Sequence, residues 1–140
     1  MLILKEEQLQ EILETEKYFE SREQYVKRMQ EEGFKMHYPE DNELLLDIDS
    51  KRSLDLFKTK FKRFNEEIML CGEEATYEIK DSKTEGHKHI IIKLPFKIET
   101  MERIALQAVL GSDLVREMLS IFRYWRDDPY PTLLARKEKS

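Results

Sequence analysis

The sequence predicts an α+β domain in which a four-stranded antiparallel sheet carries helices on one of its faces. Short apolar or alternating segments, typical of strands, lie between longer segments whose apolar residues recur every three or four positions, as in helices. Turns rich in Pro, Gly and Asp separate them. The chain has 140 residues, of which 40% are hydrophobic, and this suffices for one domain with a buried core. We therefore expect a single domain over 1–140, with a helical extension over 1–38 and the core over 43–135.

The N-terminal extension predicts two helices between residues 5 and 33. The apolar residues of the first recur at helical spacing: Leu9, Ile12, Leu13 and Phe19. Ser21, with Gln24 three positions later, is a capping-box signal for the start of the second helix, which we expect to end near Gly33. Pro39 then breaks the chain before the first strand of the core.

The core predicts a β-α-β-β-α-β order with one additional late helix. The expected elements are a strand over 43–49, a helix capped by Ser50 and apolar through Ile68, strands over 76–80 and 87–94, helices over 99–110 and after Asp113, and a short strand over 132–135. The last helix places Trp125 on its apolar, core-facing side. This order is that of the ferredoxin-like fold, which RNA-recognition motifs (RRMs) share. In it the strands over 43–49 and 87–94 are central neighbours, and the sheet face away from the helices stays open.

Composition restricts the classes of function. The formal net charge of −5 argues against a protein that coats duplex DNA through bulk electrostatics. Charge is uneven, because residues 1–33 are rich in Glu while residues 51–63 hold six Lys or Arg against one Asp. Cys71 is the single cysteine, so no internal disulfide forms. No apolar run is long enough to span a membrane and no signal peptide is evident, so we expect a cytoplasmic protein.

Two acids and two histidines are expected to meet at one corner of the sheet. Side chains alternate along a strand, so Asp47 and Asp49 share one face, and His87 and His89 share one face of the later strand. Because neighbouring strands of this fold run antiparallel, the end of the first strand lies beside the beginning of the later one. Paired aspartates suit Mg²⁺ or Mn²⁺, and a nearby histidine suits a triphosphate.

The residues Leu46-Asp47-Ile48-Asp49 resemble the hydrophobic-Asp-hydrophobic-Asp motif of the archaeo-eukaryotic primase superfamily, which includes primase-polymerases. The segment from Ser82 to His89 is similar to the second motif of that family. The resemblance implies an RRM-like fold, nucleotide and template binding, Mg²⁺ or Mn²⁺ held by Asp47 and Asp49, and, in an active enzyme, catalysis by these two acids with His89. Ser120 stands where the family has a third acid, and the hairpin lacks a glycine-rich turn. We therefore expect a degenerate, non-catalytic relative.

Residues 43–135 also resemble small uncharacterised phage and archaeal-virus proteins. The likeness lies in Lys93-Leu-Pro95, in the segment that begins with Glu102-Arg103, and in Leu110-Gly-Ser-Asp113 with Arg116. It implies an accessory protein of a phage or another mobile element, and it implies no particular activity.

The leading hypothesis is that the chain binds nucleic acid or a nucleotide. The expected phosphate-contacting residues are Lys51, Arg52, Lys58, Lys62, Arg63, His87 and Lys93, which would bind the backbone without reading its sequence. The basic face of this helix is more typical of a solvated surface that balances the acidic N-terminal helices. Two alternatives stay open: an inhibitor or adaptor that binds a host or phage protein, as in anti-defence, and an active metal-dependent nucleotidyltransferase or nuclease.

Overall fold

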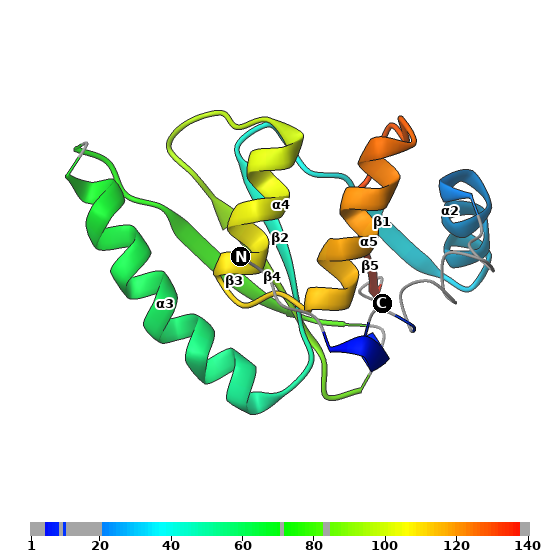
Figure 1. The fold of residues 1–140 in the computed structure, drawn as a ribbon, viewed down its shortest axis with the longest axis horizontal. Helices are drawn as coiled ribbons and strands as arrows, with labels where there is room; N and C mark the ends of the chain where they lie inside the picture. The colour runs from blue at the N-terminus through cyan, green and yellow to red at the C-terminus, as the bar shows by residue number, and fades with distance from the viewer. Residues whose placement is uncertain (1–4, 9, 11–20, 71, 83–84, 138–140) are drawn as a thin grey trace.

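The structure is a computed structural model, and it describes residues 5–8, 10, 21–70, 72–82 and 85–137. Its principal helices are α2 (Arg22–Glu31), α3 (Lys51–Met69), α4 (Thr100–Val109) and α5 (Leu114–Trp125). Figure 1 shows α3 and α4 over the strands, with α5 next to α4 and α2 at the far end of the molecule. The apolar residues of the first expected helix, Leu9, Ile12, Leu13 and Phe19, lie outside the described residues.

The strands of the described chain form two antiparallel sheets. The strands are β1 (Phe34–His37), β2 (Glu43–Ile48), β3 (Thr76–Asp81), β4 (Lys88–Lys93) and β5 (Leu134–Lys137). Three of them form one sheet in the order β2-β4-β3, and β1 pairs with β5 in the other. The chain is thus an α+β protein with antiparallel sheets. The expected pairing of the strands near 43–49 and 87–94 is confirmed by the β2–β4 register, but β2 lies at the edge of its sheet and not at the centre.

Helix boundaries follow the caps that the sequence predicts. The Ser21 hydroxyl accepts the backbone N–H of Gln24 at 3.1 Å, and the Gln24 side chain accepts that of Ser21 at 3.1 Å, so the capping box is complete. The Ser50 hydroxyl accepts the N–H of Ser53 at 3.1 Å and starts α3. Asp113 caps α5 by accepting the N–H of Val115 at 3.2 Å.

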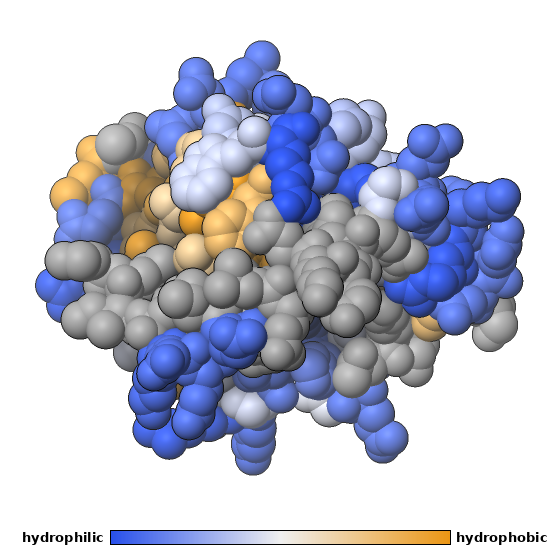
Figure 2. Space-filling view, turned by 45° about the vertical axis from the view of Figure 1, so that its right-hand side comes forward, coloured by the Kyte–Doolittle hydropathy of each residue, from blue (hydrophilic) through white to orange (hydrophobic). Residues whose placement is uncertain are grey.

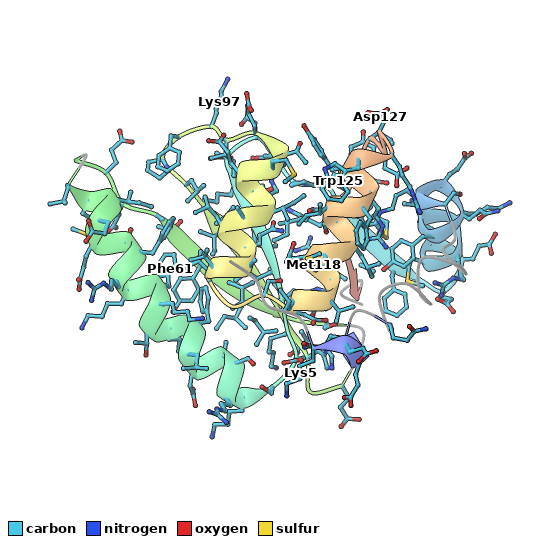
Figure 3. All side chains as sticks on the ribbon, viewed as in Figure 1. Lys5, Phe61, Lys97, Met118, Trp125 and Asp127 are labelled. Atoms are coloured by element: carbon cyan, nitrogen blue, oxygen red, sulfur yellow. The ribbon has the colours of Figure 1, made fainter. Side chains whose placement is uncertain are left out.

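The main core lies between the three-stranded sheet and helices α3 and α4. Its buried residues come from alternate positions of β2 and β4 and from the apolar stripe of α3: Leu44, Leu46, Ile48, Ile90, Ile92, Phe57, Phe61 and Ile68. The Phe61 ring contacts Tyr77 of β3 edge-on, with a centroid distance of 4.7 Å. Figure 3 shows Phe61 on α3 beside the sheet, and Trp125 near the upper end of α5. Trp125 is 67% exposed, so the prediction that it faces the core is wrong.

The predicted four-stranded sheet is not formed, because the last strand pairs with β1 instead of β2. Side chains of α4 and α5 already occupy the free edge of β2. The backbone C=O groups of Glu43 and Leu45 accept hydrogen bonds from the guanidinium groups of Arg103 and Arg116. The remaining bonds join Leu45 N–H to Gln107 Oε1, Asp47 N–H to Ser112 Oγ and Asp113 N–H to Asp47 C=O, at 2.8, 3.0 and 2.8 Å. A strand at this edge would find its hydrogen-bonding groups already taken.

The second sheet also covers part of the face that was expected to stay open. Leu134 of β5 packs on Leu45 and Ile91, whose side chains point away from α3. Helix α2 in turn packs on β1 and β5 through Met29, with Met36 as its main buried contact from β1. The strand β1 was not predicted at all, and its pairing joins the N-terminal extension to the last strand of the core.

Candidate functional site

Asp47 and the two hairpin histidines lie together, as the alternation of the strands predicts. Asp47 and His89 are directly opposite in the β2–β4 register. One oxygen of Asp47, Oδ1, lies 3.8 Å from His89 Nε2 and 3.9 Å from His87 Nδ1. The corner is more enclosed than expected, since the His89 side chain is 7% exposed and that of Asp47 24%.

Asp49 lies beyond the end of β2, next to the start of α3. It is exposed, and it accepts the hydroxyl of Ser53 at 3.4 Å. Its carboxylate is close enough to raise the pKa of Asp47 slightly. The two acids are therefore neighbours, but Asp49 contributes to the first turn of α3 and Asp47 to a half-buried corner.

The surroundings of Asp47 disfavour its ionised form. Burial raises the pKa of the carboxyl above its usual value, and Arg116 and His87 oppose that shift only in part. Within the described chain, Oδ1 of Asp47 is buried and accepts no hydrogen bond. A buried carboxylate oxygen of this kind favours a proton donor or a cation as its neighbour.

A cavity of about 240 Å³ opens beside this corner, and three arginines line it. Arg22 comes from α2, and Arg116 and Arg123 come from α5. His89 and Ser82 line the same cavity. We call these five residues with their cavity the arginine cavity. It lies between the two sheets, so its lining is assembled from segments far apart in the sequence.

The three guanidinium groups of the arginine cavity repel one another. Burial, with Arg123 and Arg116 nearby, lowers the pKa of Arg22 to about 9. Burial, with Arg116 nearby, lowers the pKa of Arg123 to about 10. Both side chains remain protonated at neutral pH, so the protein holds neighbouring cations in a partly desolvated space.

Carboxylates at and around the cavity balance part of this charge. Glu117 is buried and binds Arg116 at 2.7 Å. Burial lowers the pKa of Arg22 and of Arg123, and the nearby Asp128 opposes this lowering in part. Asp113 and Asp47 also line the cavity, but burial disfavours the charge on Asp47. An anion in the cavity would therefore relieve repulsion among the arginines.

Backbone carbonyl groups fix two of the three arginines. Arg22 donates to the carbonyl oxygens of Tyr130 and Pro131 at 3.0 and 2.9 Å. Arg116 donates to Leu45 and Leu133. These bonds orient the guanidinium groups before any ligand arrives. None of the three arginines is among the site residues predicted from the sequence, because no local pattern connects α2 with α5.

The basic residues predicted on α3 are not part of this site. Lys51, Arg52, Lys58, Lys62 and Arg63 are exposed on the helix that covers the opposite face of the sheet. Lys93 lies at the far end of β4 from His89 and pairs with Glu40 and Glu43 at 3.8 and 3.9 Å. Of the predicted nucleic-acid-binding residues, only His87 lies at the Asp47 corner.

The described residues contain no group of three or more His, Cys, Asp or Glu side chains arranged to hold a metal ion. None of the described helices is long and apolar enough to cross a membrane.

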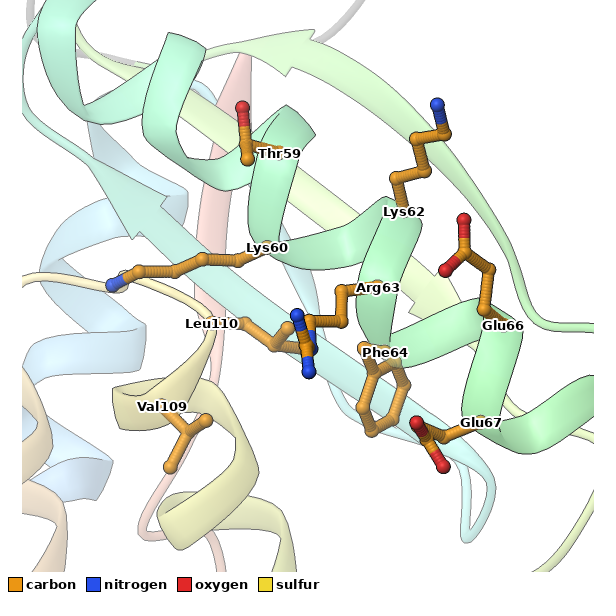
Figure 4. A pocket seen from close by; sticks show the side chains of 9 residues that line it. All are labelled: Thr59, Lys60, Lys62, Arg63, Phe64, Glu66, Glu67, Val109 and Leu110. Atoms are coloured by element: carbon orange, nitrogen blue, oxygen red, sulfur yellow. The ribbon is translucent and has the colours of Figure 1, made fainter.

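A second cavity, of about 670 Å³, lies between α3 and the end of α4. Figure 4 shows Arg63 and Phe64 of α3 on one side of this space and Val109 and Leu110, at the end of α4, on the other. The other lining residues are polar or charged: Thr59, Lys60, Lys62, Glu66 and Glu67. Val109 is 65% exposed, so the α3–α4 groove offers apolar surface to the outside. Among the described residues of the face drawn in Figure 2 most are hydrophilic, and the larger apolar area lies on its left-hand side.

Comparison of the chain with protein-family models, with curated proteins and with solved structures finds no match.

Proposed function

We propose that this protein binds nucleic acid or a nucleotide, without catalysis, by receiving a phosphate group in the arginine cavity. The observation that carries the proposal is the convergence of Arg22, Arg116 and Arg123 on one cavity beside His89. Guanidinium groups present planar pairs of N–H donors that match phosphate oxygens. A phosphate would also separate and neutralise cations that otherwise repel one another.

The size of the cavity indicates which part of the ligand enters. Its volume of about 240 Å³ is below the roughly 300–1,000 Å³ typical of pockets that enclose a whole small molecule. We therefore propose that a phosphate or diphosphate group enters and that the rest of the ligand lies outside. Binding of this kind does not depend on base sequence.

The absence of catalysis is part of the proposal. Ser120 donates its hydroxyl to the backbone carbonyl of Arg116 at 3.1 Å and is fully buried. Glu117, the nearest acid in sequence, is engaged by Gln107, Ser112 and Arg116. Neither residue supplies a third carboxylate beside Asp47. Under this proposal Mg²⁺ or Mn²⁺, held by Asp47 and Asp49, is not needed for binding.

We also propose that the fold is a degenerate RRM-like, primase-like one, in an accessory protein of a phage or mobile element. The order β2-β4-β3, with α3 between β2 and β3, supports this proposal, because it matches three of the four strands of a ferredoxin-like sheet. The helical edge on β2 then replaces the fourth strand.

The direct test is fluorescence anisotropy with labelled single-stranded oligonucleotides and nucleotides at low salt, with and without Mg²⁺. We expect Arg123→Gln to weaken binding at least tenfold and Arg123→Lys to weaken it less. Lys97→Gln removes the same charge at an exposed, distant position and serves as the control. Absence of wild-type binding below about 100 µM, the weak end of non-specific nucleic-acid binding, would refute the proposal.

The α3–α4 groove favours a second candidate function, in which this protein is an inhibitor or adaptor that binds a host or phage protein. Its apolar floor and charged rim are typical of grooves that receive an amphipathic helix. Val109→Glu places a charge on the exposed part of the groove and should abolish capture of a stoichiometric partner while the protein stays folded. If the variant and the wild type retain the same proteins from a lysate, this candidate fails.

A further inference from the structure

The two edge strands of the three-stranded sheet differ in whether their outward-facing backbone groups have hydrogen-bond partners. Groups from α4, from α5 and from the turn between them satisfy the outward-facing groups of β2, as described above. Along the outer edge of β3, by contrast, no strand pairs with Thr76–Lys80 within the described residues. Only beyond the end of β3 does Ser82 form a bridge to Arg136 of β5.

The register of the sheet identifies the groups that face outward from β3. Leu45 uses its N–H and C=O for Gln107 and Arg116, so it does not bond to Ile91, which lies opposite it in β4. In an antiparallel sheet Ile91 then bonds to its other neighbour, Glu78 of β3. The alternate residues Tyr77 and Ile79 therefore present their backbone N–H and C=O groups at the outer edge.

The side chains of β3 are open to solvent as well. Tyr77 and Ile79 are each 39% exposed, although both point to the apolar face of the sheet. The strand contains no proline. A regular, exposed edge strand with apolar residues at alternate positions is a template for pairing with another strand.

We propose that β3 pairs antiparallel with β3 of a second copy of this chain, in a register centred on Ile79. In this register Ile79 faces Ile79 of the second copy through the outward-facing backbone groups. Glu78 then lies opposite Lys80 of the second copy, and the two-fold symmetry repeats this pair. Opposite charges directly across a strand pair stabilise it. The result would be a continuous six-stranded sheet.

Charge selects this register over its neighbours. A register centred on Glu78 would place two glutamates opposite each other, and one centred on Lys80 would place two lysines opposite each other. Like charges in directly opposed positions are destabilising. Within one chain Lys80 lies 3.5 Å from Glu78, so both side chains already lie on the same face. The proposal is independent of the function assigned to the arginine cavity.

Sedimentation equilibrium of the full chain tests the proposal. The protein concentration runs from about 10 µM to about 1 mM, because a small interface is expected to associate weakly. We expect a concentration-dependent dimer. Glu78→Lys and Lys80→Glu should each lower the association constant at least tenfold. An equimolar mixture of the two variants should restore the dimer, because each lysine then faces a glutamate of the other chain.

The fold of each variant is checked by its melting temperature and circular dichroism, which should stay close to the wild type because Glu78 is exposed and Lys80 is only half-buried. A wild type that stays monomeric at about 1 mM would overturn the proposal, because a dimer with a dissociation constant below this concentration would then be populated. So would a dimer that tolerates both charge reversals, or a mixture of the two variants that stays monomeric.

Discussion

Asp47 takes part both in the closed edge of β2 and in the candidate site. Its backbone closes the edge of β2 through Ser112 and Asp113, and its side chain faces His89 across the β2–β4 pair. Burial is the largest influence on its carboxyl and raises its pKa. The ionised form is therefore a cost to the folded state in the absence of a bound partner.

The raised pKa of Asp47 predicts a pH-dependent gain from Asp47→Asn. Below about pH 3.8, the ordinary value, the carboxyl is protonated in the folded and the unfolded chain, and the variant should be nearly neutral. As the pH rises through the elevated pKa, the wild type loses stability relative to the variant. Urea unfolding at pH 3.5 and pH 7.5 measures this difference.

Asp49→Asn is the matched control, because Asp49 is exposed at the start of α3. It should show little difference between the two pH values. A large loss of stability of Asp47→Asn at pH 7.5 would mean that attraction to His87, His89 and Arg116 outweighs the burial of Asp47.

At the scale of elements, the closed edge of β2 is the feature that most distinguishes this fold from the expected one. The α4–α5 pair supplies side chains in place of a neighbouring strand. Gln107 is central to it, because its amide accepts the N–H of Leu45 at 2.8 Å and donates to Glu117 at 2.8 Å. All three residues are buried.

Gln107→Ala should therefore destabilise the protein by about 2–4 kcal/mol, because a buried backbone N–H and a buried carboxylate each lose a partner. Urea unfolding provides the measurement. Gln30→Ala, on the exposed side of α2, should change stability by less than about 0.5 kcal/mol. A similar small effect of Gln107→Ala would show that β2 does not need this closure.

The same elements show what could be predicted from the sequence. Caps and apolar stripes are local, so α2, α3, β2, β3 and β4 follow from Ser21, Ser50 and the spacing of apolar residues. Strand β1 has four residues and pairs with a strand about a hundred positions later, so no local signal marks it. The replacement of the fourth strand depends on Arg103, Gln107 and Arg116, whose contacts exist only in the folded chain.

The candidate site likewise has one part that the sequence predicts and one part that it does not. Alternation along two strands predicts that Asp47 and His89 meet, and they do. The arginine cavity depends on Arg22 reaching α5 from a separate helix, which periodicity does not reveal. The basic stripe of α3 is evident in the sequence, but the helix covers the other face of the sheet.

At the scale of the whole molecule, β5 connects the two sheets. Leu134 is buried against Leu45 and Ile91 of the three-stranded sheet, while its strand pairs with β1. The same packing forms one wall of the arginine cavity. The position of α2, and with it Arg22, thus depends on a small apolar contact.

Leu134→Ala should cost about 2–5 kcal/mol, as expected for a buried leucine, and should increase hydrogen exchange in β1 and β5 more than in β4. Leu70→Ala, at an exposed position, should cost less than about 0.5 kcal/mol. Equal exchange in all strands would show that the two sheets unfold as one unit.

The central claim is that the arginine cavity receives a phosphate group, and thermal unfolding in pyrophosphate against chloride at equal ionic strength tests it most directly. We predict that pyrophosphate stabilises the wild type, by about 2.7 kcal/mol at 100 times its dissociation constant. Arg123→Gln should lose this gain, and Lys97→Gln should keep it. Equal stability of the wild type in both salts, or an undiminished gain in Arg123→Gln, would contradict the claim.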